Sequence, residues 1–412
     1  MPDKVVITGM GTINPIGLTV GETWQNAING VSGVGPITLF DAEEYLVSHA
    51  CEVKDFTPEK YMDARDARRR DRFQQFASAA SQEAIQQSGL EVSEEESGKV
   101  GVIVSSAIGG LQAVADNLRV LMDKGPRRIS PFAIPMLMSN GAAGLIAIDN
   151  GFRGPSFSVA SACASGADGV GMAWLLIRAG IIDVAISGAS EAIITEVALS
   201  AFDRMRALSR RDGDDRDTPQ PFDLNRDGLV MGEGAAILVL ERESRAIKRG
   251  ADILAELAGY GGTADAFHIT APSADGIGGS KAIQSALEAA EANPEDIGYI
   301  SAHGTATKLN DLSETRAIKK VFGDLAYEIP ISSTKSMTGH MMGTTGALEA
   351  IFCVQAIREN ILPPTINYET PDPECDLDFI PNAAREKDIT MAVSNAFGFG
   401  GHNAVLVVKE YS

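Results

Sequence analysis

The sequence predicts an α/β fold in which short buried strands alternate with helices. Three observations carry this prediction. Apolar residues make up 44% of the 412 residues, short apolar runs recur between amphipathic segments, and glycines stand where many of those segments end. The 42 glycines follow no fixed period, which excludes a collagen-like chain. A chain of this length forms one large domain or about two to three ordinary ones.

Strands and helices are expected to alternate through the first half of the chain. A short strand that starts at Val5 is predicted to end at Gly9. The helix that begins at Gly166 is predicted to stop before Gly180, a residue that suits a helix C-terminus. The predicted strands are residues 5–8, 100–105, 155–160, 184–188 and 234–241, and the predicted helices are 73–87 and 166–179.

The second half repeats this arrangement, with predicted strands at 251–259, 299–302 and 330–333 and predicted helices at 279–292, 313–321 and 346–359. The helices after Cys163 and after His340 both follow turns of small residues, so we expect them to occupy equivalent places in two related halves. Because no Pro- or Ser-rich linker separates the halves, we predict one compact unit. Its N-terminal half (1–250) carries the cysteine and its C-terminal half (251–412) carries the histidines.

Composition narrows the classes of function. A net charge of −20 and a pI near 4.7 argue against nucleic-acid binding. The four cysteines show no CxxC spacing, which favours a reducing compartment. There is no signal-peptide pattern and no apolar run long enough for a bilayer, so a cytoplasmic protein without a membrane partner is expected.

The basic residues gather in three groups despite the acidic total. Each group is either a solvated face or part of a docking patch for an acidic partner. The groups are Arg65, Arg68, Arg69, Arg70 and Arg72; Lys124, Arg127 and Arg128; and Arg204, Arg206, Arg210 and Arg211.

Cys163 is the first candidate for a reactive side chain. Tiny residues surround it in Val159-Ala160-Ser161-Ala162-Cys163-Ala164-Ser165-Gly166-Ala167, at a predicted strand-to-helix turn. The helix N-terminus is expected to lower the pKa of the thiol, and the small neighbours leave room for a substrate. The alternative is a buried structural cysteine, which is the commonest fate of a free cysteine and the interpretation that suits Cys353.

His303 and His340 are the histidines most suited to chemistry, because both lie beside glycine at the end of a predicted strand. Any single histidine is more often structural. One cysteine and two histidines could also bind a metal ion. No close ligand spacing such as HxxxH or CxxC is present, so no metal site is predicted.

Several longer motifs resemble, in their order, the elongating β-ketoacyl-[acyl-carrier-protein] synthases, most closely those of the synthase II type. The match covers nearly the whole chain. The motifs are Val5-Val6-Ile7-Thr8-Gly9-Met10-Gly11, Pro221-Phe222-Asp223, Arg226-Asp227-Gly228, Gly232-Glu233-Gly234, Lys335-Ser336-Met337-Thr338-Gly339-His340 and Asn395-Ala396-Phe397-Gly398-Phe399-Gly400-Gly401. The resemblance implies a thiolase-like fold with duplicated halves in a layered αβαβα arrangement, usually as a homodimer.

The resemblance also implies an acyltransferase that elongates fatty acids. Cys163 would accept the acyl chain, and His303 and His340 would serve decarboxylation and hold the thioester carbonyl. Lys335 would orient and polarise the site with Glu349 as its partner. The backbone N–H groups of Cys163 and Phe399 would form the oxyanion hole, and the Phe399 side chain would act as a gate.

Further positions are implied to bind substrate rather than to react. Ile108 and Phe202 would line the acyl tunnel, and Phe397 lies beside the gate. Thr270, Thr305 and Thr307 would contact pantetheine. The substrates would arrive on the phosphopantetheine of an acyl carrier protein, with no cofactor bound by the enzyme itself. The carrier would dock on Arg65, Arg68, Arg69, Arg127, Arg128 and Arg206.

The function expected is therefore the decarboxylative Claisen condensation of acyl and malonyl carrier proteins. A ketosynthase of a type II polyketide or aryl-polyene pathway is the alternative, because it would share Cys163, His303 and His340. A degradative thiolase would show a second cysteine where Phe397-Gly398-Phe399 stands, and a synthase III-like enzyme would have Asn in place of His340. A non-catalytic chain-length factor would lack Cys163. The sequence does not fix the length of the primer.

Overall fold

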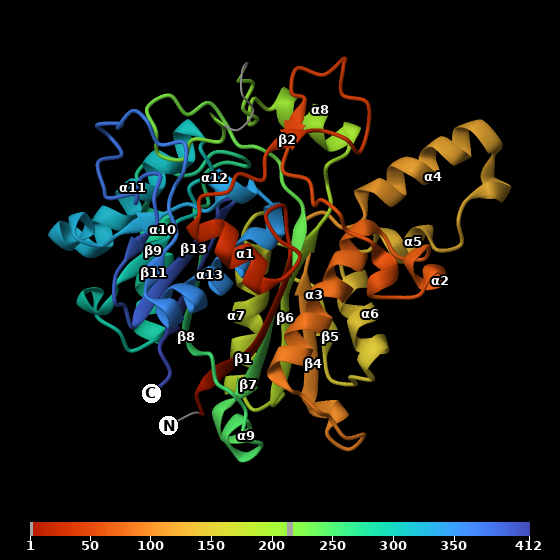
Figure 1. Ribbon diagram of the computed structural model, residues 1–412, viewed down its shortest axis with the longest axis horizontal. Coiled ribbons are helices and arrows are strands. Elements are labelled where there is room, and N and C mark those ends of the chain that lie inside the picture. Colours follow the sequence, from red (N-terminus) through yellow and green to blue (C-terminus); the bar gives the residue numbers. More distant parts are fainter. Residues whose placement is uncertain (1–2, 212–216) are drawn as a thin grey trace.

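The fold is built around a ten-stranded mixed sheet, seen in a computed structural model that describes residues 3–211 and 217–412 (Figure 1). The strand order is β10-β9-β13-β14-β8-β1-β7-β6-β4-β5. The strands are β1 (Val5–Ile13), β4 (Val100–Ser105), β5 (Ser156–Phe157), β6 (Val184–Glu191), β7 (Gly234–Arg242), β8 (Ala255–Ala264), β9 (Tyr299–Ser301), β10 (Ile331–Ser332), β13 (Met391–Gly398) and β14 (His402–Lys409). Two small sheets pair β2 (Gly35–Pro36) with β3 (His49–Ala50), and β11 (Ile361–Leu362) with β12 (Arg385–Glu386).

The large sheet consists of two five-stranded halves with the same pattern of directions. In the first half β5, β4 and β6 run parallel, and β7 and β1 follow antiparallel. In the second half β10, β9 and β13 run parallel, and β14 and β8 follow antiparallel. The halves join through β1 and β8, where Val6 pairs with Glu256 and Ile7 with Ala255. This repeat agrees with the predicted duplication.

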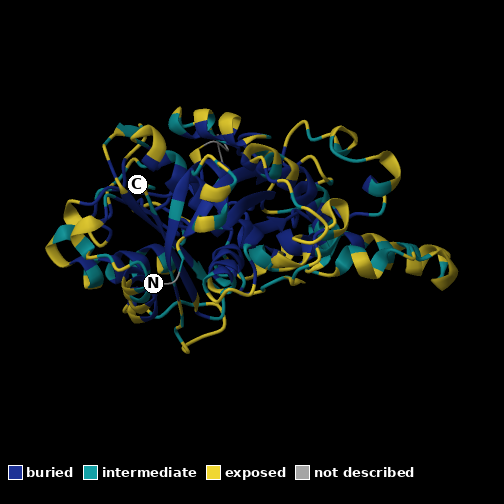
Figure 2. Cartoon of the chain, turned by 90° about the horizontal axis from the view of Figure 1, so that it is seen from below, coloured by how far each residue is buried: buried dark blue, intermediate teal, exposed yellow. Residues whose placement is uncertain are grey.

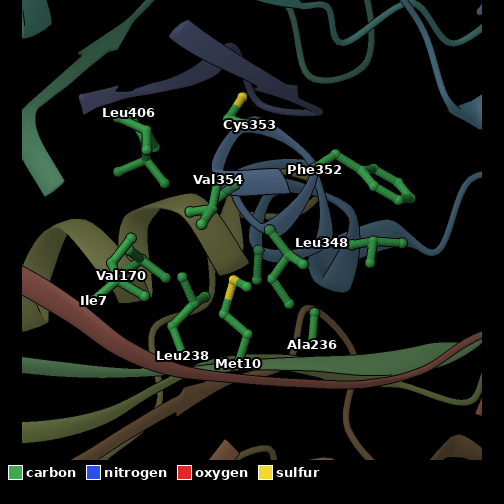
Figure 3. Close-up of a cluster of buried hydrophobic side chains, with 14 of the residues drawn as sticks. Ile7, Met10, Val170, Ala236, Leu238, Leu348, Phe352, Cys353, Val354 and Leu406 are labelled. Atoms are coloured by element: carbon green, nitrogen blue, oxygen red, sulfur yellow. The ribbon is translucent and has the colours of Figure 1, made fainter. Parts of the chain in front are cut away.

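Two helices lie between the halves, and others cover the two outer faces. The inner helices, α7 (Ser165–Arg178) and α13 (Thr345–Glu359), share one apolar cluster with residues of both half-sheets, and Figure 3 shows Ile7, Val170, Leu348 and Leu406 within it. The outer helices are α3 (Arg72–Ser88) and α6 (Gly141–Asn150) on one side and α10 (Ile277–Ala289) and α11 (Lys308–Phe322) on the other. The order helix, sheet, helix, sheet, helix is the predicted layered arrangement.

The remaining α-helices among the described residues are short or peripheral. They are α1 (Val20–Ile28), α2 (Ala64–Ala67), α4 (Leu111–Lys124), α5 (Ala133–Leu137), α8 (Glu196–Arg204), α9 (Glu243–Lys248) and α12 (Lys335–Thr338). Helix α4 extends away from the body of the molecule (Figure 1), and yellow exposed segments lie at the periphery of Figure 2 while the interior is buried. In the part of the chain described, no helix combines the length and the hydropathy needed to cross a bilayer.

Several predicted elements had wrong ends. The strand expected over 251–259 is Ala255–Ala264, the strand expected over 184–188 continues to Glu191, and the helix expected over 313–321 begins at Lys308. The strand expected to stop at Gly9 continues to Ile13 because its glycines allow close packing against α3. A Cβ at Gly9 would lie 2.1 Å from the carbonyl oxygen of Ala84. The strand expected over 155–160 is paired only at Ser156–Phe157, since the chain beyond it leaves the ladder and turns toward Cys163.

Candidate active site

Cys163 lies in a tight turn immediately before α7, with 6% of its surface exposed. The preceding residue, Ala162, has a φ of +52°, a left-handed conformation that costs energy for a residue other than glycine. Ser165 holds the turn closed, because its Oγ donates to the Ala162 carbonyl at 2.6 Å and accepts from the Ser161 N–H at 2.9 Å. The turn also needs a small neighbour, since a Cβ at Gly398 would lie 3.0 Å from the Cys163 nitrogen. The strained turn thus presents the sulfur at the start of a helix.

The two predicted histidines lie beside this sulfur. The His303 and His340 rings meet edge to face, with centroids 5.4 Å apart and an interplanar angle of 83°. Ligand-type atoms of Cys163, His303 and His340 all lie within 4.8 Å of one another. These residues come from distant parts of the chain, so the fold confirms that the three side chains meet.

Backbone contacts fix each histidine in place. The N–H groups of His303 and Gly304 donate to the two carboxylate oxygens of Glu314 at 2.7 and 2.8 Å. The His340 N–H donates to the Val230 carbonyl at 2.7 Å, and its Nδ1 lies 3.2 Å from the Thr345 Oγ1. Sequence reasoning missed Glu314, because a carboxylate on a helix gives no local sign that it will reach the amides of a neighbouring loop.

Both imidazoles are neutral at pH 7. Burial is the main cause that holds the pKa of His303 and His340 well below the usual 6.5, and the positive charge of Lys335 acts in the same direction. A neutral imidazole carries one N–H and one acceptor nitrogen, so each ring can donate a hydrogen bond to a developing oxyanion.

The resting state of Cys163 is the thiol, which corrects the predicted lowering of its pKa. Burial raises the pKa of the thiol to about 11, and it outweighs the Phe399 backbone N–H and the Lys335 charge, which act to lower it. Glu191 adds to the increase. The start of α7 cannot compensate for removing the sulfur from water.

We expect alkylation of Cys163 by iodoacetamide to keep accelerating as the pH rises above 8.5, the usual pKa of a cysteine thiol. The reason is that the reactive thiolate reaches half occupancy only near pH 11. The rate can be followed by intact-protein mass spectrometry, with the Cys163→Ala variant giving the background from the other cysteines. A rate that reaches its plateau below pH 8 would contradict a raised pKa.

Lys335 and Glu349 form a buried ion pair, the partnership that the family resemblance implied. The Lys335 Nζ donates to the Glu349 Oε1 at 2.5 Å, and the side chains are 1% and 0% exposed. Burial raises the pKa of Glu349 to about 8, while Lys335 opposes this. Breaking such a pair costs about 3–5 kcal/mol because one charge is left buried without its partner. The pair therefore anchors a positive charge near both imidazoles.

A cavity of about 320 Å³ leads to the cysteine and the histidines. The predicted substrate-contacting residues that line it are Phe202, Thr270, Thr305, Thr307, Phe397 and Phe399. The Phe399 ring stacks on Phe202, with centroids 6.3 Å apart. Ile108 is not part of this lining; it lies in the turn before α4 and is 39% exposed. Lys335 is buried behind the cavity wall.

Two loops at the cavity are tied together by residues that sequence reasoning missed. The Asp265 carboxylate accepts from the Asn403 Nδ2 at 2.8 Å and from the Ser273 N–H at 2.9 Å. The Gly400 N–H donates to the Ile269 carbonyl at 2.8 Å. The segment that carries Phe399 is thereby connected to the loop that carries Thr270.

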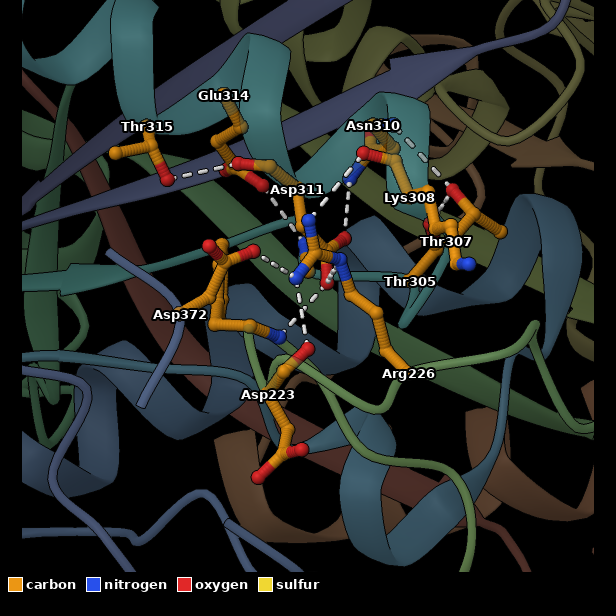
Figure 4. Close-up of polar contacts among 12 residues, drawn as sticks. Asp223, Arg226, Thr305, Thr307, Lys308, Asn310, Asp311, Glu314, Thr315 and Asp372 are labelled. Carbon is orange, nitrogen blue, oxygen red and sulfur yellow. Dashed lines mark hydrogen bonds and ion pairs between the residues drawn. The ribbon is translucent and has the colours of Figure 1, made fainter. Parts of the chain in front are cut away.

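Arg226, which belongs to one of the quoted motifs, supports the threonine side of the cavity (Figure 4). Its guanidinium is buried and contacts the Asp372 carboxylate at 2.6 Å, the Asp223 carbonyl at 2.7 Å and the Asp311 carboxylate at 3.7 Å. Asp311 lies in the first turn of α11, the helix that begins directly after Thr307. Arg226 is therefore structural, because it holds the start of α11, whereas Asp227 and Gly228 of the same motif line the cavity.

The six arginines predicted for docking lie on or near the surface. Arg65, Arg68, Arg127, Arg128 and Arg206 are exposed, and Arg206 also lines the cavity. Arg69 is half-buried, with its guanidinium 4.8 Å from the centre of the Phe132 ring. Two neighbours in the same group serve the fold instead: Arg70 pairs with Asp149 and Arg72 with Glu233.

Comparison with known proteins places the whole chain in one family. The model of the beta-ketoacyl synthase N-terminal domain matches residues 2–246, and that of the beta-ketoacyl synthase C-terminal domain matches residues 254–369. The 3-oxoacyl-[acyl-carrier-protein] synthase 2 of Staphylococcus aureus (strain COL) is 49% identical over 408 residues, covering 99% of this chain and 98% of that protein. The protein of the same name from Synechocystis is 48% identical over 408 residues, with the same coverage.

A solved structure shares this architecture. It is the complex of a type II polyketide acyl-carrier protein with its ketosynthase bound to the hexaketide. The TM-score is 0.92 at 35% identity, with full coverage of both chains. The thiolase-like α/β fold and the family inferred from the motifs are thus confirmed, and the chain belongs to the β-ketoacyl synthases.

Proposed function

We propose that this protein condenses acyl-[acyl-carrier-protein] with malonyl-[acyl-carrier-protein] to give 3-oxoacyl-[acyl-carrier-protein] in fatty acid elongation. The observation that carries the proposal is the convergence of a thiol and two neutral imidazoles at the end of one cavity. A thiol alone can accept an acyl group, but a condensation also needs hydrogen-bond donors for a second, anionic intermediate.

In the first half-reaction the Cys163 thiol loses its proton and its sulfur attacks the acyl thioester. The phosphopantetheine thiol of the carrier leaves, and the acyl chain is bound to Cys163. The oxyanion of this step lies within reach of the Cys163 and Phe399 backbone N–H groups, both of which face the sulfur. The buried site disfavours a free thiolate, and a bound thioester displaces the remaining water. The thiol therefore loses its proton as its sulfur attacks the thioester, rather than beforehand.

In the second half-reaction malonyl carrier protein enters and loses CO2. The electron pair of the broken C–C bond forms an enolate, whose carbon attacks the acyl thioester and releases the Cys163 sulfur. The N–H groups of His303 and His340 are placed to stabilise the enolate oxygen as it becomes negative. Burial, with the Lys335 charge, keeps both imidazoles neutral, and each neutral ring still carries one N–H that can donate.

The same three side chains could ligate a metal ion, since their donor atoms lie within 4.8 Å of one another. We assign them to catalysis rather than to metal binding, and propose no bound cofactor. The observations in favour are the cavity that ends at the sulfur and the β-ketoacyl synthase family of the chain. The phosphopantetheine that carries the substrates would extend along Thr270, Thr305 and Thr307.

We further propose that the carrier protein docks on Arg65, Arg68, Arg69, Arg127, Arg128 and Arg206. This set provides cations on a chain whose net charge is −20, so an acidic partner is attracted there and repelled elsewhere. No role is proposed for nucleic acid or membrane, and the cytoplasm is the proposed location.

Replacing Arg68 and Arg128 by glutamate is expected to raise KM for acyl carrier protein at least about tenfold, the effect of losing two interface charges. The KM for an acyl-CoA substrate should change much less, since CoA needs no protein docking surface. Steady-state kinetics with both donors measure the difference. An equal loss with both donors would assign the effect to the fold instead of docking.

A homodimer is proposed from the apolar surface around β5. Among the residues that the structure describes, this strand ends the large sheet and leaves one edge unpaired. Exposed apolar side chains gather on the neighbouring helices α4, α5 and α6, namely Leu118, Leu121, Met122, Ile134 and Ile148. A second copy would cover both the edge and this surface. Within each protomer we propose residues 1–250 and 251–412 as the two halves of one unit.

The experiment that tests the function is elongation of purified acyl carrier proteins loaded with saturated or monounsaturated primers. A product two carbons longer as a 3-oxoacyl carrier protein is expected. The second candidate is a type II polyketide ketosynthase, favoured by the structural match at 35% identity. That function would give no elongation of these primers and repeated extension of a poly-3-oxo chain.

A further inference from the structure

A network of two hydroxyls and one carboxylate holds the segment just before the nucleophile. Asp168 lies in the first turn of α7, and its Oδ2 accepts a hydrogen bond from the Ser161 Oγ. The Tyr260 hydroxyl, from β8, donates to the other oxygen, Oδ1, at 2.7 Å. Asp168 therefore joins the segment before Cys163 to a strand in the second half of the sheet.

The Tyr260 ring that completes this network is closely packed. A Cβ at Gly171 of α7 would lie 2.3 Å from the Cδ2 of the ring, and a Cβ at Gly262 would lie 2.8 Å from its hydroxyl oxygen. The two glycines thus leave the space that the ring occupies. Burial and the Asp168 carboxylate raise the pKa of Tyr260, so its hydroxyl keeps the proton that it donates.

The network adjoins the strained part of the nucleophile turn. Ser161 directly precedes Ala162, whose φ of +52° is unfavourable for a residue other than glycine. A strained conformation persists only where surrounding contacts hold it. Ser165 supplies two such contacts within the turn, to the Ser161 N–H and the Ala162 carbonyl. Asp168 adds a connection from the turn to the second half of the sheet.

The sulfur has to be aligned with groups that this second half carries. His303, His340 and Phe399 all belong to residues 251–412, whereas Cys163 belongs to the first half. The Phe399 N–H faces the sulfur and is proposed to stabilise the oxyanion. A misplacement of about 1 Å can slow such a reaction about a hundredfold. A connection between the halves beside the sulfur therefore bears on the rate of attack.

We propose that Asp168 is a positioning residue for Cys163: by accepting hydrogen bonds from hydroxyls on both halves of the sheet, it holds the sulfur in line with the oxyanion-stabilising groups. This rests on the proposed function, because the reaction that is aligned is acyl transfer to Cys163. The geometry of the two carboxylate oxygens, rather than the negative charge, is what the alignment needs.

The test measures acyl transfer from acyl carrier protein to Cys163 by intact-protein mass spectrometry. The rate at saturating carrier protein should fall about tenfold in Ser161→Ala and in Tyr260→Phe, the effect of losing one hydrogen bond to a carboxylate. The carrier concentration that gives half the maximal rate should stay within about twofold of the wild type, because the docking surface is unchanged.

The Asp168→Asn variant separates geometry from charge. Its amide oxygen can accept from one hydroxyl while its NH2 donates to the other, since a hydroxyl can accept as well as donate. Its rate of acyl transfer should therefore stay within about threefold of the wild type.

Alkylation of Cys163 by iodoacetamide is the second readout. A small reagent needs access to the sulfur but no alignment with the Phe399 N–H. In Ser161→Ala and Tyr260→Phe the alkylation rate should thus change less than about twofold, while acyl transfer falls. A role limited to keeping the turn folded would change both rates together.

Trp174→Phe is the matched control. The Trp174 Nε1 donates to the Leu257 carbonyl at 2.9 Å, so this bond also joins α7 to β8, but later in the helix and away from the turn. Its loss should lower thermal stability and leave the rate of acyl transfer unchanged.

Four outcomes would overturn the proposal. They are acyl transfer that is unchanged in both Ser161→Ala and Tyr260→Phe, equal losses of acyl transfer and alkylation in these variants, a tenfold or greater loss in Asp168→Asn, and a loss in Trp174→Phe as large as that in Tyr260→Phe. A wild type that acyl carrier protein does not acylate contradicts the proposed function itself. A wild type that is acylated no faster than these variants contradicts only this inference.

Discussion

Replacing Cys163 by alanine is expected to abolish acyl-enzyme formation and to lower condensation by at least about 10⁴-fold, as for other covalent nucleophiles. The Cys163 sulfur lines the cavity beside the two imidazoles, and the Phe399 N–H faces it. No nearby hydroxyl can replace it, because Ser161 and Ser165 are engaged in holding the turn. Intact-protein mass spectrometry after incubation with acyl carrier protein measures the adduct.

Cys353→Ala is the matched control for this experiment. Cys353 is a buried cysteine in α13 that packs in the central apolar cluster, so its loss should leave acylation intact (Figure 3). Acylation that persists in Cys163→Ala, or that disappears in Cys353→Ala, would show that the nucleophile is misassigned.

Replacing His303 by alanine is expected to separate the two half-reactions. Condensation should fall about 10²–10³-fold, the usual effect of removing one oxyanion donor. Acyl transfer to Cys163 should persist, because the Phe399 N–H and the turn around the sulfur do not depend on the imidazole. Stopped assays measure the acyl-enzyme by mass and the 3-oxoacyl product by chromatography.

The His303→Asn variant tests the physical reason for that result. Its amide can donate a hydrogen bond without the acid-base chemistry of imidazole, so part of the condensation rate should return. Equal loss of acyl transfer and condensation in His303→Ala would mean that the imidazole serves the first half-reaction as well, or that the loop held by Glu314 has changed.

The local pattern of apolar and small residues predicted the ends of strands and helices well where neighbouring residues determine those ends. The strand Val100–Ser105 and the helices after Cys163 and after His340 were predicted within a residue or two of their ends. The strand after Val5 was predicted too short, because close packing of its glycines on α3 is a tertiary effect. The layered arrangement and the family came from the resemblance, not from periodicity.

The chemistry of the site was only partly predictable. The sequence indicated Cys163, His303, His340 and the Lys335–Glu349 pair, and the fold brings these together. It gave the wrong direction for the pKa of Cys163, since a helix start is visible in a sequence but burial is not. The supporting carboxylates Glu314 and Asp265 were missed for a similar reason: their hydrogen-bond partners lie on other segments, which only the fold brings near.

A single-turnover experiment tests the central claim most directly. Cys163 is first loaded from acyl carrier protein, the excess donor is removed, and malonyl carrier protein is added. The account predicts that the acyl mass leaves Cys163 at the rate at which 3-oxoacyl carrier protein and CO2 appear, in equal amounts. Release of CO2 while the acyl chain stays on Cys163 would contradict this account. So would formation of 3-oxoacyl carrier protein by an enzyme that was never acylated at Cys163.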